Sequence, residues 1–147
     1  MFLGRYRHSL DNKGRLTVPA RYRYMLEEGA FITKGFDANL VVMTPAAFSN
    51  ISKQVSQKNY TDPEARLLKR YIFSNGEQVE LDRSGRILIP QFLRESASLD
   101  SDVVLIGVGD FFEIWSPENW EQQDVQLADT EGNVERFVDF EISTSTG

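Results

Sequence analysis

The 147-residue sequence contains no cysteine and a single histidine, His8. The lack of cysteine excludes disulfide bonds, thiolate metal sites and cysteine nucleophiles, and it fits a reducing cytosol. One histidine leaves too few ligands for a typical transition-metal site, so we expect no metal and no other cofactor. No apolar run is long enough to span a membrane, and Arg5 and Arg7 interrupt any signal peptide. We therefore expect a cytoplasmic protein with no membrane partner.

Signals of catalysis are equally scarce. No pair of carboxylates falls in an evident pocket, and the stretch Gly107-Val108-Gly109 lacks the third glycine and the helix start of a dinucleotide-binding loop. We predict no catalytic residues and no small-molecule substrate, which argues against an enzyme.

Positive charge is scarce overall but concentrated at one end of the chain. The formal net charge is −6, yet residues 1–24 hold six basic side chains against Asp11 alone, which gives +5 there and −11 elsewhere. The six are Arg5, Arg7, Lys13, Arg15, Arg21 and Arg23. A basic pole on an acidic body attracts polyanions at one place and repels them elsewhere.

The sequence does contain one motif that occurs twice. The stretch LDNKGRLTVP, residues 10–19, returns as LDRSGRILIP, residues 81–90, 71 positions later. An arginine follows each proline by four residues, as Arg23 and Arg94. A tandem duplication is the simplest explanation.

Each copy predicts a tight turn between two strands. Asp favours the first position of a type I turn, and Gly takes a positive φ at the fourth, in Asp11–Gly14 and again in Asp82–Gly85. In a simple hairpin Asp11 lies opposite Arg15, Leu10 opposite Leu16, Ser9 opposite Thr17 and His8 opposite Val18. The alternation of a strand then exposes one set of side chains, namely Arg5, Arg7, Ser9, Asp11, Arg15 and Thr17.

The second copy presents a different outer face in the same register. It consists of Gln78, Glu80, Asp82, Arg86 and Leu88. Its formal charge is −1, whereas the face of the first copy carries +2. The sequence thus predicts that the same fold occurs twice and that the two copies present outer faces of different charge.

The rest of the chain predicts an α+β fold rich in β-structure. Helices are expected after Pro19, Pro45, Pro63 and Pro90, with strands between them. The predicted organisation is a first repeat over 5–47, a helical connector over 48–75, a second repeat over 76–119 and an acidic C-terminal tail over 120–147. The tail shows no clear period over 124–135, and its polar end, 143–147, is expected to be mobile.

An Asp-x-x-Gly-Arg turn followed by an apolar strand, a proline and a short helix resembles the AbrB-like swapped-hairpin domains. The tandem copies, the opening MFLG and the stretch GRLTVPARYR are similar to the MraZ family of bacterial transcriptional regulators, over residues 1 to about 120. The resemblance implies two half-barrels of the swapped-hairpin, double-psi type, a closed homo-oligomeric ring, and binding to repeated boxes in the protein's own promoter. The family's promoter lies in the division and cell wall gene cluster, so the resemblance also implies association with the nucleoid.

The family's Asp-x-x-x-Arg motif corresponds to Asp11 with Arg15 and to Asp82 with Arg86. We predict that Arg15 contacts double-stranded DNA, that Lys13, Arg5 and Arg7 contact phosphates, and that Arg86 contributes less, because Ser84 replaces the lysine of the first copy. Four residues are assigned to the turns themselves, namely Asp11, Gly14, Asp82 and Gly85. In the alternative interpretation each arginine only fixes its turn by pairing with the aspartate, and the protein is an oligomeric scaffold or adaptor that binds a protein partner.

Overall fold

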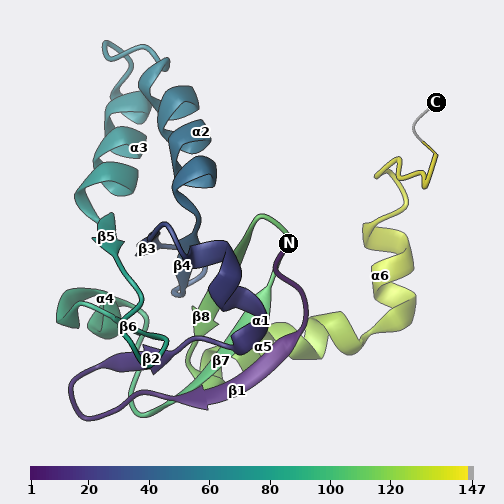
Figure 1. Ribbon diagram of the computed structural model, residues 1–147. Helices are drawn as coiled ribbons and strands as arrows, with labels where there is room; N and C mark the ends of the chain where they lie inside the picture. The colour runs from purple at the N-terminus through teal and green to yellow at the C-terminus, as the bar shows by residue number, and fades with distance from the viewer. Residues whose placement is uncertain (146–147) are drawn as a thin grey trace. The chain divides into compact units, whose positions relative to one another are not determined.

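The computed structural model describes residues 1–145 and divides into two compact units, Met1–Pro117 and Glu118–Gly147 (Figure 1). The strands are β1 (Arg5–Ser9), β2 (Arg15–Thr17), β3 (Ala30–Lys34), β4 (Leu40–Met43), β5 (Glu77–Val79), β6 (Arg86–Leu88), β7 (Asp102–Gly107) and β8 (Phe111–Trp115). The helices are α1 (Ala20–Arg23), followed by the 3-10 turn η1 (Tyr24–Leu26), α2 (Pro45–Ser56), α3 (Pro63–Ser74), α4 (Gln91–Ser96), α5 (Pro117–Ala128) and α6 (Thr130–Arg136).

The sheets of the first unit are built symmetrically from the two repeats. Six antiparallel strands follow the order β1-β7-β8-β4-β3-β5, and β2 pairs with β6 in a two-stranded sheet. When β1 is matched with β5, β7 with β3 and β8 with β4, the order reads the same from either end. The predicted α+β fold is confirmed, and the strands of the two repeats are interleaved within one sheet.

The predicted turns form, but the strands that leave them do not make simple hairpins. The amide of Asp11 donates to the carbonyl of Arg15 at 3.0 Å, and Leu10 bridges to Leu16. Beyond that pair β1 joins β7, whereas β2 crosses to β6, so the expected pairs Ser9 with Thr17 and His8 with Val18 are wrong. The exchange places Leu16 opposite Ile87, and both side chains are buried.

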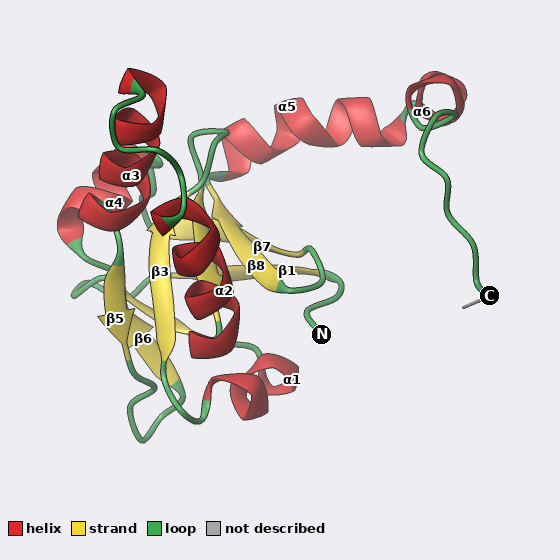
Figure 2. Ribbon diagram, turned by 90° about the horizontal axis from the view of Figure 1, so that it is seen from above, coloured by secondary structure: helices red, strands yellow, loops and turns green. Residues whose placement is uncertain are grey.

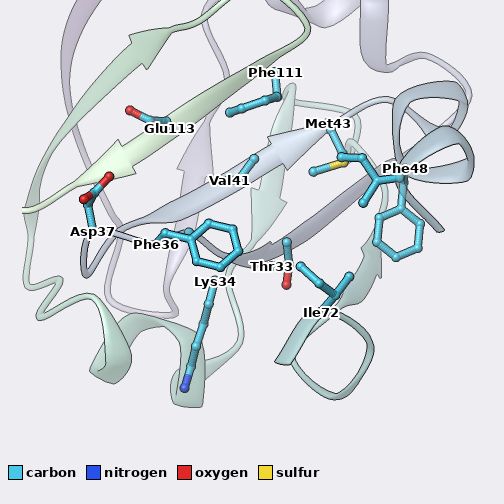
Figure 3. Close-up of a pocket in the computed structure, with 12 residues that line it drawn as sticks. Thr33, Lys34, Phe36, Asp37, Val41, Met43, Phe48, Ile72, Phe111 and Glu113 are labelled. Atoms are coloured by element: carbon cyan, nitrogen blue, oxygen red, sulfur yellow. The ribbon is translucent and has the colours of Figure 1, made fainter. Parts of the chain in front are cut away.

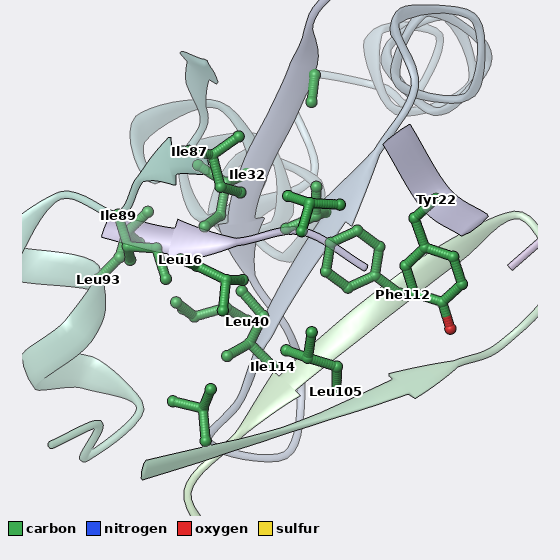
Figure 4. Packing of buried hydrophobic residues seen from close by; sticks show 14 of the residues in the cluster. Leu16, Tyr22, Ile32, Leu40, Ile87, Ile89, Leu93, Leu105, Phe112 and Ile114 are labelled. Carbon is green, nitrogen blue, oxygen red and sulfur yellow. The ribbon is translucent and has the colours of Figure 1, made fainter. Parts of the chain in front are cut away.

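The core lies between these exchanged strands and is shared by both repeats. Figure 4 shows Leu16, Ile87 and Ile89 beside Leu40 and Ile114 from the central strands. Each of these side chains is at most 1% exposed. Because neither repeat can enclose this apolar surface alone, we expect the two to fold as one cooperative unit.

The helices begin where the sequence predicts. Thr44 caps α2 by accepting a hydrogen bond from the amide of Ala47 at 3.1 Å, and Asp62 caps α3 by accepting from Glu64 at 3.0 Å. The two helices lie side by side as a helical hairpin (Figures 1 and 2). They occupy the segment predicted as a connector, and we retain the division into repeats over 5–47 and 76–119 as a proposal.

The segment predicted as an acidic tail is helical over much of its length. α5 extends to Ala128, and Asp129 caps α6 by accepting from the amide of Gly132 at 3.1 Å. The sequence pattern missed the part of α5 beyond residue 119 and the whole of α6, because their apolar residues, such as Val125 and Val134, stay exposed and give no helical stripe. Of the segment expected to be mobile, residues 146 and 147 lie outside the described residues.

Candidate nucleic-acid interface

Three hydrogen bonds to the Asp11 carboxylate stabilise the first turn, and two of them come from Arg15. One carboxylate oxygen of Asp11, Oδ1, accepts from the backbone amides of Lys13 at 3.0 Å and Arg15 at 2.8 Å. The other, Oδ2, accepts from Nε of Arg15 at 2.6 Å. This bond uses Nε of Arg15, and the arginine side chain is 30% exposed.

The second turn repeats this geometry. Asp82 Oδ1 accepts from the amides of Ser84 and Arg86, each at 2.9 Å, and Oδ2 accepts from Nε of Arg86 at 2.8 Å. The pairing of each aspartate with its own arginine, proposed above as a way to fix the turn, is therefore present in both copies.

The structure brings the two motifs into one cluster. Nη1 of Arg86 lies 3.7 Å from Oδ2 of Asp11, across the repeats. This contact follows from the strand exchange, since the β2–β6 register sets Arg86 opposite Thr17, two residues from Arg15 on the same strand. We call Asp11, Arg15, Asp82 and Arg86 the acid–arginine cluster. The two predicted faces, which differ in formal charge, therefore adjoin each other where β2 pairs with β6.

Hydrogen bonding keeps both carboxylates of the cluster ionised. The pKa of Asp11 falls from 3.8 to about 2, mainly because the backbone amide of Arg15 donates to the carboxylate. The pKa of Asp82 is lowered for the same reason, by the amide of Arg86.

These pKa shifts predict a loss of stability in acid. Since the pKa of Asp11 in the folded protein lies below its unfolded value, the ionised carboxylate stabilises the fold above about pH 4, and this contribution disappears as the pH falls towards 2. Urea midpoints measured from pH 6 to pH 2 should fall less steeply below pH 4 for Asp11→Asn than for the wild type. Parallel curves would show that the turn does not depend on the charge.

Two arginines outside the cluster each contact the opposite repeat. Arg94 Nε donates to the carbonyl of Ile89 at 3.0 Å, and its guanidinium lies against Gly14 of the other repeat. In the symmetric arrangement Arg23 Nε donates to Val18 at 2.8 Å and its guanidinium lies against Gly85. The recurrence of an arginine after each proline thus marks a packing role that spans the repeats.

The remaining predicted DNA contacts lie outside the cluster. Arg5 and Arg7 are exposed on β1, and Lys13 is exposed at the tip of the first turn. The first turn therefore combines the exposed Lys13 with the partly exposed Arg15, whereas Ser84 occupies the position of Lys13 in the second turn. Residues 72–95, the counterpart of 1–24, carry three arginines against four acidic side chains, a formal charge of −1.

No metal-binding group and no membrane-spanning helix occur within the described part of the chain. No three His, Asp or Glu side chains there are placed to hold a metal ion. Likewise, no helix among residues 1–145 combines the length and apolarity needed to cross a bilayer.

Two interlocked copies of a strand-exchanging turn, each with an acid–arginine pair, define a tandem swapped-hairpin protein. The profile of the family described as "MraZ protein, putative antitoxin-like" matches the chain twice, over residues 1–71 and 72–140. The chain belongs to the MraZ family.

Relatives in the family are named as transcriptional regulators. The chain is 47% identical to the transcriptional regulator MraZ of Roseiflexus castenholzii over 121 residues, which cover 82% of this chain and 85% of the relative. It is 41% identical to that of Leuconostoc mesenteroides subsp. mesenteroides over 143 residues, covering 97% and 100%. The transcriptional regulator MraZ of Dictyoglomus turgidum is 47% identical over 122 residues, covering 83% and 84%. These names agree with the expectation of a regulator rather than an enzyme.

Proposed function

We propose that this protein is a transcriptional regulator that binds double-stranded DNA through the basic surface of its first repeat. The observation that carries the proposal is the charge contrast between equivalent segments, +5 over residues 1–24 and −1 over 72–95. Because the fold of the two repeats is the same, this difference is not needed for folding. It suits a function that only one copy performs, and a phosphate backbone is the ligand for which clustered arginines and lysines fit best.

Arg15 has the central role in this proposal. Asp11 binds the guanidinium through Nε, and we infer that the two Nη groups remain available as donors in one plane. A planar pair of donors matches either a phosphate or the O6 and N7 edge of guanine. Lys13, Arg5 and Arg7 are exposed around or before the turn and contribute phosphate contacts, while Arg86, which lies near two carboxylates, contributes less.

Several copies of the chain act together in the proposed complex. The strands β1 and β5 form the two edges of the six-stranded sheet, and exposed edges are commonly covered by association. A ring of copies, as the family resemblance implies, would present identical basic turns to repeated boxes in the protein's own promoter, in the division and cell wall cluster. Weak contacts made by linked copies multiply in affinity, which favours repeated sites over single ones. Such a complex is associated with the nucleoid.

The salt dependence of binding tests the proposal against the adaptor alternative. A fragment of the chain's own upstream region should bind with a logarithmic slope of about −4 per bound copy if the four basic side chains contact phosphates. Fluorescence anisotropy from 50 to 300 mM salt measures this slope, and a fragment of equal length with scrambled repeats is the control. An adaptor whose basic surface is incidental would bind both fragments equally weakly, and that result would refute the proposal.

A further inference from the structure

An apolar cavity of about 190 Å³ lies in the first unit, between the sheet and the α2–α3 hairpin, away from the acid–arginine cluster. Its walls come from the strands β3, β4 and β8, the helices α2 and α3, and the loop from β3 to β4. Figure 3 shows Val41 and Met43 of β4, Phe111 of β8, Phe48 of α2 and Ile72 of α3 around it. Lys34 and Glu113 stand at its border, with the Lys34 amine directed away from the group in Figure 3.

One polar atom stands out among these apolar walls. Thr33 on β3 is 4% exposed, and its hydroxyl Oγ1 has no hydrogen-bond partner within the described residues. Burying a hydroxyl without a hydrogen-bond partner is energetically unfavourable. A ligand that pairs with Oγ1 recovers this cost.

The second repeat shows that the fold does not require a hydroxyl here. Thr33 pairs with Val41 on β4, and in the other repeat Ile106 pairs with Glu113 at the equivalent place. An isoleucine therefore serves equally well in the strand itself. The polar atom at Thr33 belongs to the cavity, not to the sheet.

The border of the cavity includes an exposed aromatic side chain. Phe36 is 75% exposed and follows β3 in the loop to β4, where its ring stacks on Tyr71 at 5.2 Å. The cavity is partly open to solvent at its border, so a ligand can enter without unfolding any helix or strand.

We propose that this cavity is a binding site for a small uncharged molecule, one aromatic ring that carries a single hydroxyl or amino group. The size follows from the volume, because a cavity of about 150 Å³ accommodates benzene. The polar substituent follows from Thr33, which offers one hydrogen bond in an otherwise apolar space. A carboxylate is disfavoured, because the walls are apolar and Glu113 at the border would repel it.

Two probes of one shape test the site in the full-length protein, namely p-cresol, which has the hydroxyl, and toluene, which lacks it. Methyl chemical shifts of Val41, Met43 and Ile72, followed during titration, report binding at the cavity. In the wild type both probes should perturb these methyls. Thr33→Val keeps the shape but removes the hydrogen bond, and it should change the ratio of the two affinities about tenfold in favour of toluene.

Matched variants distinguish the effect of removing the Thr33 hydroxyl from a general loss of structure. Thr33→Ser retains the hydroxyl and should keep the wild-type ratio, and Thr17→Val, an exposed threonine on β2, should leave both affinities unchanged. The proposal is overturned if saturating p-cresol moves none of the cavity methyls, or if the ratio is the same in wild type and Thr33→Val. Because DNA is absent from the assay, the result does not depend on the proposed function.

Discussion

Arg15→Ala should lower affinity for the promoter fragment by about 100-fold or more, whereas Arg86→Ala should lower it by about tenfold or less. A well-placed arginine contact contributes about 1–3 kcal/mol, and the losses multiply when several copies bind repeated sites. The difference between the two variants follows from the number of carboxylates that lie near each arginine. Arg15 is bound by one carboxylate, that of Asp11, but Arg86 lies 2.8 Å from Asp82 and 3.7 Å from Asp11. Two neighbouring acids leave Arg86 less able to attract a third anion.

Gel shifts at fixed salt measure the losses, and sedimentation velocity shows whether each variant keeps its oligomeric state. Arg15→Lys is the matched control, because it preserves the charge but not the planar pair of Nη donors. It should fall between wild type and Arg15→Ala. Equal losses for Arg15→Ala and Arg86→Ala would contradict the assignment of DNA binding to the first repeat and would indicate that the cluster acts as one unit.

The local structure of each repeat could be predicted from the sequence because its signals are short-range. An aspartate and a glycine three positions apart define the turn, and a proline after a threonine or an aspartate marks a helix start. Asp11 opposite Arg15, and α2 and α3 beginning at Pro45 and Pro63, follow from such signals. Each depends on fewer than five consecutive residues.

The strand exchange could not be predicted from residue patterns alone. Leu16 has the same alternation whether it pairs within its own hairpin or with Ile87 of the other repeat, so both topologies satisfy the pattern. The contact between Arg86 and Asp11 depends on that topology and was missed with it. The swapped-hairpin resemblance contained the signal, since exchange between tandem copies brings the two motifs onto neighbouring strands.

Gly14→Ala should destabilise the protein by about 3 kcal/mol, far more than Gly109→Ala, although both glycines have a positive φ. Gly14 has a φ of 81°, which costs an alanine about 1 kcal/mol. Its new Cβ would also lie 2.6 Å from Nε and Cζ of Arg94. The guanidinium must move away and lose its bond to the Ile89 carbonyl, at a further cost of about 2 kcal/mol. Urea denaturation of the full-length protein measures the difference.

Gly109→Ala distinguishes the cost of backbone strain from the cost of losing the Arg94 contact between the repeats. Gly109 has a φ of 95°, but an added Cβ there meets no atom within 4 Å, so its alanine should cost only about 1 kcal/mol. A double-mutant cycle completes the test, because Gly14→Ala should also cost only about 1 kcal/mol when Arg94 is already alanine. An unchanged free-energy cost of Gly14→Ala in that background would show that the Arg94 guanidinium moves aside without loss of stability. In that case the strain of the turn itself, rather than the guanidinium of the other repeat, would explain the need for glycine.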